Sequence, residues 1–153
     1  MAVGTRHVMP FDGATQTLVN PTNATYTGDA VDGFENAETF IWQLDVSGKS
    51  LSTGTIDIYI QTLLPGGAWT DLHHLSQITV ATIGNGNFYG KVSIANATNI
   101  AASTAVQDAA LGAAAVATGS PMTDTLRVKT VVSTLTGGDT ITLVLTVQAS
   151  KSA

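Results

Sequence analysis

Two adjacent histidines are the residues of this sequence best suited to chemistry. His73 and His74 follow Asp71 and Trp69 in the stretch LLPGGAWTDLHHL, and imidazole and carboxylate groups bind metal ions and transfer protons. Residues 65–68 (Pro-Gly-Gly-Ala) predict a turn, from which a strand returns at Trp69. Neighbouring side chains of a regular strand point to opposite faces, so both imidazoles cannot bind one ion. We therefore predict structural histidines in one arm of a hairpin, and no metal site.

A complication arises from the two leucines that flank these histidines. Leu72 and Leu75 have opposite parity, so both can be buried only if the strand slips by one residue. A β-bulge at 73–74 would produce that slip. The bulge could also turn both imidazoles to one side. A metal ion would then still need a third ligand, for which Asp71 and His7 are the candidates.

Other patterns associated with catalysis or cofactor binding are missing or fit poorly. The chain has no Cys, which excludes thiol nucleophiles, disulfides and cysteine-based metal centres. No G-x-S-x-G nucleophile turn, P-loop or dinucleotide fingerprint is present. An acidic run recurs at every third position, whereas a calcium loop needs ligands at alternate positions; we interpret this run as a solvated loop. It consists of Asp29, Asp32, Glu35 and Glu38. We predict that the protein is not an enzyme, with no catalytic residue and no cofactor.

Composition restricts the partners that this protein can have. The 153 residues suit one domain. Charged residues make up 11% of them, against about 25% in an average soluble domain. The formal net charge is −5 and there are 24 Thr. Scattered cations in an acidic chain argue against nucleic acid, and no apolar stretch suits a membrane span or secretion signal. A charge-poor, hydroxyl-rich surface costs little to desolvate, which favours packing against other subunits.

Period-two alternation predicts several half-buried strands. Their expected core residues are Phe40, Trp42, Leu44 and Val46; Ile56, Ile58 and Ile60; Phe88, Val92 and Ile94; Leu126, Val128 and Val132; and Ile141, Leu143, Leu145 and Val147. Gly137-Gly138-Asp139 is expected to supply positive-φ residues for the last hairpin turn, and Asn85-Gly86 the tip of another.

Two segments lack this alternation. Residues 1–25 are predicted to form an extended N-terminal arm with a short strand at 15–19, lying on its own domain or on a neighbour. Residues 95–119 hold eleven Ala, which favours either a short helix over 104–111 or a long loop. Residues 26–153 are then a single domain. The strand count and missing crossover helices predict an all-β antiparallel β-sandwich, with a jelly-roll topology preferred.

Two sets of side chains are predicted on the outward faces. One set, which has outward parity, consists of Lys91, Arg127 and Lys129. These cations would form one basic patch if their strands were neighbours. Otherwise they are solvated residues that keep a sheet face polar. Tyr59 and Tyr89 also have outward parity. With Trp69, they could stack on sugar rings if exposed.

Several of these stretches resemble small β-sandwich virion proteins of tailed bacteriophages. In that family a DVYLQ-type strand runs into a Gly-rich turn and a Trp-Thr-Asp-Leu strand, and an LRVKW-like strand precedes a final hydrophobic strand. The matching residues are Asp57 to Gln61, Gly66-Gly67, Trp69 to Leu72 and Leu126 to Lys129. The resemblance covers roughly residues 40–149, and its motifs are structural. The turn in LLPGGAW is shorter than the family's Pro-Asp-Gly-Gly-type loop.

The resemblance implies a head decoration or auxiliary capsid protein. We therefore expect a structural virion protein: a capsid decoration (cement) protein that binds the major capsid protein on the outer shell and stabilises it. It would associate with copies of itself as a homo-oligomer, such as a trimer. It would lie on the capsid surface of the virion after assembly in the host cytoplasm. The alternatives are a carbohydrate-binding, lectin-like sandwich module and another minor virion component of the tail or neck. No nucleic acid or membrane partner is expected.

Overall fold

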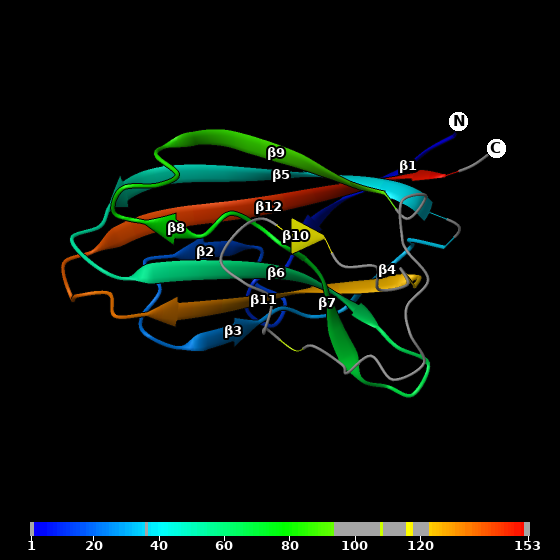
Figure 1. Ribbon diagram of the computed structural model, residues 1–153, viewed down its shortest axis with the longest axis horizontal. Helices are drawn as coiled ribbons and strands as arrows, with labels where there is room; N and C mark the ends of the chain where they lie inside the picture. The colour runs from blue at the N-terminus through cyan, green and yellow to red at the C-terminus, as the bar shows by residue number, and fades with distance from the viewer. Residues whose placement is uncertain (1, 36, 94–107, 109–115, 118–122, 152–153) are drawn as a thin grey trace.

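The computed structural model of the chain describes residues 2–35, 37–93, 108, 116–117 and 123–151 (Figure 1). Every regular element in these ranges is a β-strand. Their bounds are β1 Ala2–Met9, β2 Thr17–Val19, β3 Thr25–Thr27, β4 Val31–Asp32, β5 Ala37–Ser50, β6 Thr55–Leu63, β7 Trp69–His74, β8 Ile78–Thr79, β9 Gly86–Ser93, β10 Val116–Ala117, β11 Thr125–Ser133 and β12 Thr140–Lys151. None of the described elements is a helix that could cross a bilayer.

The strands form two sheets that pack face to face as a β-sandwich. The first sheet has the order β1-β12-β5-β9, with β2 also paired to β12. The second has the order β10-β7-β6-β11-β3, with β4 on β11 and β8 on β6. All pairings between these strands are antiparallel. The predicted antiparallel β-sandwich is therefore confirmed, whereas the jelly-roll topology stays a prediction.

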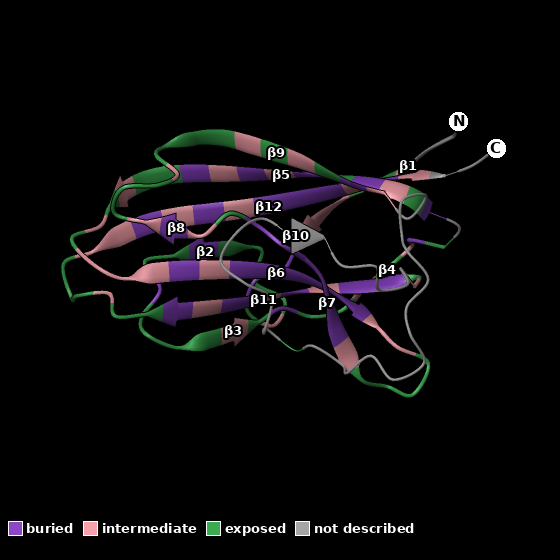
Figure 2. Cartoon of the chain, viewed as in Figure 1, coloured by how far each residue is buried: buried purple, intermediate pink, exposed green. Residues whose placement is uncertain are grey.

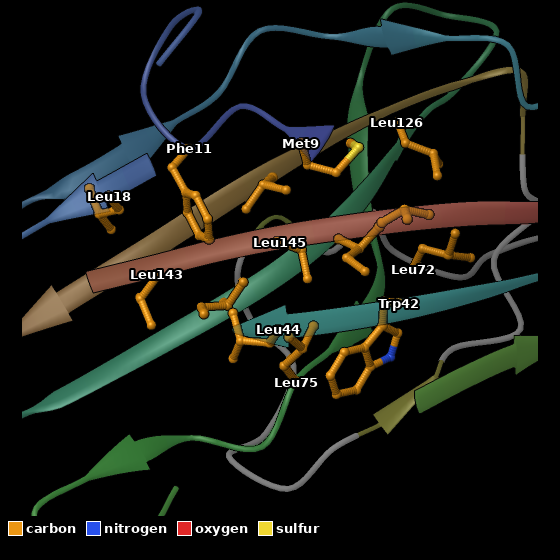
Figure 3. Close-up of a cluster of buried hydrophobic side chains, with 14 of the residues drawn as sticks. Met9, Phe11, Leu18, Trp42, Leu44, Leu72, Leu75, Leu126, Leu143 and Leu145 are labelled. Carbon is orange, nitrogen blue, oxygen red and sulfur yellow. The ribbon is translucent and has the colours of Figure 1, made fainter. Parts of the chain in front are cut away.

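The core lies between the sheets, where the alternating apolar side chains meet (Figures 2 and 3). The residues predicted to point inward on β5, β6, β11 and β12 are all buried. On β9, Val92 is buried, and Phe88 is partly buried against the core. Ile94 lies outside the described residues. Apolar burial at about 25 cal/mol per Å² is the main stabilising contribution in a core of this kind.

The N-terminal segment is extended and pairs with strands β12 and β11 of the same chain. β1 pairs with β12 from Ala2↔Lys151 to Met9↔Leu145. β2 pairs with the same strand over Thr17–Val19, which lies within the range predicted for a short strand. Met9, Phe11 and Leu18 point into the core (Figure 3). β3 spans the predicted boundary between residues 25 and 26 and pairs with β11. The segment therefore contributes strands to both sheets.

The turns agree with the sequence in part. At 65–68, Leu64 N donates to Ala68 O at 2.7 Å, and Gly67 takes a φ of +86°. The 83–86 turn likewise contains positive φ, at Ile83 and at Gly86, the second of its two glycines. In the last hairpin, however, the left-handed residue is Thr134 (φ +58°) and not Gly137 or Gly138, so that expectation was wrong. The bends at 134–139 are instead held by Asp139, as described below. The helix considered at 104–111 lies outside the described residues except for Asp108.

Candidate functional site

The two histidines point into different environments because they are consecutive residues of a regular strand segment that follows a bulge. His73 pairs with Ile60, whereas Asp71 pairs with Gln61, so Leu72 is the extra residue of a bulge. The predicted bulge is confirmed, although it lies one residue before the predicted position. Leu72 and Leu75 are both buried, as the slip requires.

His73 lies on the core side of the second sheet. Its ring centroid is 5.7 Å from that of Trp42, which reaches across from β5. His74 lies on the outer face, beside Tyr59. The imidazoles therefore cannot share a metal ion. In the part of the chain that the structure describes, no group of three or more His, Asp or Glu side chains is arranged to hold a metal ion.

His74 belongs to a buried polar cluster on the outer face of β6 and β7. Its ring stacks on Tyr59 with centroids 4.2 Å apart, and its Nε2 lies 3.0 Å from Asp57 Oδ1. Gln77 Nε2 donates to both Asp57 oxygens, at 2.9 and 3.1 Å. Desolvation, together with the nearby Asp57 and Asp71, raises the pKa of Tyr59 to about 12, so the phenol stays neutral. His74 is 1% exposed, whereas Asp57 and Gln77 are partly exposed, so the imidazole itself is not open to a substrate.

A second row of polar side chains crosses three strands and is centred on Gln61. The register places Asp71, Gln61 and Arg127 side by side on β7, β6 and β11. Gln61 Nε2 donates to Asp71 Oδ1 and to Asp108 Oδ1, each at 2.8 Å. Gln61 Oε1 accepts from Arg127 Nε at 2.8 Å. These three contacts fix the amide orientation, because a donor faces two carboxylates and an acceptor faces a cation.

The two cations of β11 have different partners. Lys129 Nζ donates to Asp108 Oδ1 at 2.8 Å. That hydrogen bond, with the one from Gln61, holds the pKa of Asp108 below its usual value. Arg127 stacks on Trp69, with Cζ 4.3 Å from the ring centroid, a cation–π contact. Burial lowers the pKa of Arg127, with Asp108 opposing that effect.

The three cations Lys91, Arg127 and Lys129 do not form one patch, because their strands are not neighbours. Lys91 lies on β9 in the first sheet, whereas Arg127 and Lys129 lie on β11 in the second. The sequence gives the outward parity of each strand but not which sheet contains it, so it could not separate these residues. The predicted acidic run Asp29, Asp32, Glu35 and Glu38 is exposed throughout. No cluster of ligands forms from it among the described residues.

The three candidate aromatic residues are not equivalent. Tyr59 is 5% exposed beneath His74, so it cannot stack on a sugar. Trp69 has Arg127 over its ring. Tyr89, in contrast, is 83% exposed on β9. Beside it, Leu44, Leu75 and Phe88 line an apolar cavity of about 250 Å³ between the sheet edges. Composition alone gave no indication of this cavity.

The outer face of the first sheet carries charge mainly at its edges. Arg6 on β1, opposite Gln148, and Lys91 on β9, opposite Ile41, are exposed on this face. Five cross-strand pairs from β5 and β12 point outward along it: Thr39–Ser150, Ile41–Gln148, Gln43–Thr146, Asp45–Val144 and Ser47–Thr142. Asp45 is the single charged residue among these ten, and it accepts a hydrogen bond of 2.8 Å from Gln43 Nε2. Ile41 is 51% exposed, and Tyr89 continues the same face on the next strand. We call these ten residues with Tyr89 the neutral face.

Comparison with known proteins gives no relative from which a role could be taken. No protein-family model, curated protein or solved structure matches the chain. Inferences about function therefore depend on the geometry above and on the resemblance noted in the sequence.

Proposed function

We propose that this protein is a structural virion protein that decorates the outer shell of a phage capsid. It binds the major capsid protein and further copies of itself, and so stabilises the joints between capsid subunits. The observation that carries the proposal is the neutral face, where one charged residue stands among ten outward side chains of β5 and β12, with Arg6 and Lys91 on the strands that flank them. The resemblance of the β6, β7 and β11 sequences to phage virion proteins supports the same role.

The neutral face suits a permanent contact because of the cost of desolvation. Hydroxyl and amide groups lose less on leaving water than ions do, and they regain hydrogen bonds in an interface. Ile41 and Tyr89 supply apolar area at its centre, and aromatic residues are enriched at the energetic centres of interfaces. The centre of this contact holds a single ion, Asp45, so salt, which screens exposed charges, should reduce only the contribution of Arg6 and Lys91 at its edges.

Tyr89 also supports a second candidate function. Its exposed ring lies beside Gln43 and Asn87 on the neutral face, and aromatic rings with neighbouring amides bind sugars. In that case the sandwich is a carbohydrate-binding module. The burial of Tyr59 leaves this candidate with fewer aromatic contacts than the sequence predicted.

Rebinding of the purified protein to shells that lack it tests the decoration role. We expect saturable binding that persists when NaCl is raised from 0.1 to 1 M. Ile41→Ser and Tyr89→Ser should each weaken binding by about tenfold or more, as central interface residues do. Val80→Ser is the matched control, because Val80 is also 51% exposed but lies outside the neutral face. Release of the protein by moderate salt, or an equal effect of the control, would count against the proposal. Binding to a glycan array but not to shells would favour the sugar-binding function.

A further inference from the structure

Arg127 is a half-buried cation without a carboxylate partner among the described residues. Lys129, two residues away, has its ion pair with Asp108. Lys49 donates to the carbonyl oxygens of Thr82 and Ile83. Toward the described residues, Arg127 donates through Nε alone, to the neutral oxygen of Gln61. A partly desolvated charge normally has an ionic partner. Burial lowers the pKa of this guanidinium, and the nearby Asp108, which makes no ion pair with it, only partly opposes that effect.

The guanidinium is also held in one orientation before any partner arrives. Trp69 covers one face of it at 4.3 Å, and Gln61 fixes Nε at 2.8 Å. Gln61 itself cannot rotate without losing its contacts to Asp71 and Asp108. The two terminal amino groups of Arg127 make no hydrogen bond to the described residues. A fork fixed in this way loses little side-chain entropy on binding, which favours a two-pronged contact.

We propose that Arg127 is a binding point for the carboxylate of an Asp or Glu side chain on a protein partner. A planar carboxylate matches the fork of the guanidinium with two parallel hydrogen bonds. A monoanion fits better than a phosphate, because Asp71 and Asp108 lie close by and the cation of Lys129 is already paired. The scarcity of other cations argues against a nucleic-acid backbone as the source.

This site does not depend on the proposed virion role. It lies on the second sheet, whereas the neutral face lies on the first. A partner at Arg127 is therefore bound on the side of the sandwich away from the proposed capsid contact. Arg127 and Trp69 are also two of the residue types most often found as interface hot spots.

The test follows the side-chain resonances of Arg127 and Trp69 by NMR in the full-length protein. The probe is N-acetyl-glutamate-N-methylamide. The corresponding glutamine compound, which is uncharged, is the control. We expect the Arg127 Nε–H and Trp69 Nε1–H signals to shift saturably with the glutamate probe alone. Arg127→Gln should abolish the Trp69 shift, and Arg127→Lys should weaken binding roughly tenfold because the fork is lost. Lys91→Gln removes an exposed cation on the other sheet and should leave binding of the glutamate probe unchanged.

Several outcomes would overturn the inference. These are equal shifts with both probes, a Trp69 shift that survives in Arg127→Gln, or no shift at saturating probe in the wild type. A dispersed amide spectrum shows that each variant is folded. Sedimentation then identifies the source of the carboxylate: weaker self-association of Arg127→Gln indicates a second copy of this chain, and unchanged self-association indicates another protein. Failure to bind capsid shells would leave the NMR result standing, so the two proposals fail separately.

Discussion

Replacement of Gly90 by alanine sets two opposing effects against each other. Gly90 lies opposite Trp42 in the β5–β9 ladder. A Cβ at this position would be 2.4 Å from Trp42 Cζ2 and 2.6 Å from its Nε1. The φ of Gly90 is not positive, so alanine can adopt this backbone conformation without strain. Because alanine restricts the unfolded chain more than glycine does, this effect alone would stabilise the folded variant by about 0.4–1 kcal/mol. The clash involves the face of a buried indole, and overpacking of this kind costs about 1–3 kcal/mol.

We expect the clash to dominate, with a net loss of about 1–2 kcal/mol. For a domain of this size that corresponds to a fall in Tm of about 3–6 °C, measurable by calorimetry. Gly84→Ala is the control, because no atom lies within 4 Å of its added Cβ; it should be neutral or slightly stabilising. In a Trp42→Phe background the smaller ring leaves room, so most of the cost of Gly90→Ala should disappear. A Gly90→Ala protein as stable as wild type, or an undiminished cost beside phenylalanine, would refute the packing of Trp42 over Gly90.

Three further variants test other parts of the structure. Gln61→Glu replaces the amide donor with an oxygen facing Asp71 and Asp108, while its other oxygen still faces Arg127. Urea unfolding at pH 7 should therefore show a net loss of about 1–3 kcal/mol. Phe11→Ala removes a fully buried ring and should cost about 3–5 kcal/mol. Hydrogen bonds from Ser52 and Thr136 lower the pKa of Asp139 to about 2. Its stabilising effect is therefore present above about pH 4 and lost towards pH 2, and thermal melts of Asp139→Asn should approach wild type over that interval.

Each of these variants has a matched control at an exposed position. Gln16→Glu adds the same charge without facing two carboxylates, so its stability should be unchanged; an equal loss would implicate net charge. Val19→Ala, at a residue 57% exposed beside the core residue Leu18, should cost less than about 0.5 kcal/mol. A similar value for Phe11→Ala would contradict the docking of the N-terminal segment. Asp29→Asn, at another exposed residue, is the control for the loss of one negative charge.

The sequence predicted the sandwich because its strands alternate strictly. On β5, Phe40 to Val46 show a single inward parity, and the structure buries all four apolar residues. The same pattern predicted the slip between Leu72 and Leu75, because only a bulge can bury both. Its exact position could not be predicted, since a bulge at either neighbouring residue restores the same parity.

The candidate site was less accessible to sequence reasoning. Tyr59 and Gln61 have the parity of a wetted face, and they do lie on the outer face. Their burial depends on contacts across the fold, such as the one between Gln61 and Asp108, 47 residues away. Likewise, Lys91 and Arg127 have equivalent outward positions in sequence but lie in different sheets, because strand parity carries no information on strand order.

The most direct test of the proposed decoration role is electron cryomicroscopy of purified phage particles that carry the gene, compared with particles from which the gene is deleted. The account predicts sandwich-sized density at regular positions on the outer capsid surface, which disappears in the deletion particles. Density confined to the tail or neck would contradict it. So would identical particles with the protein left free in solution.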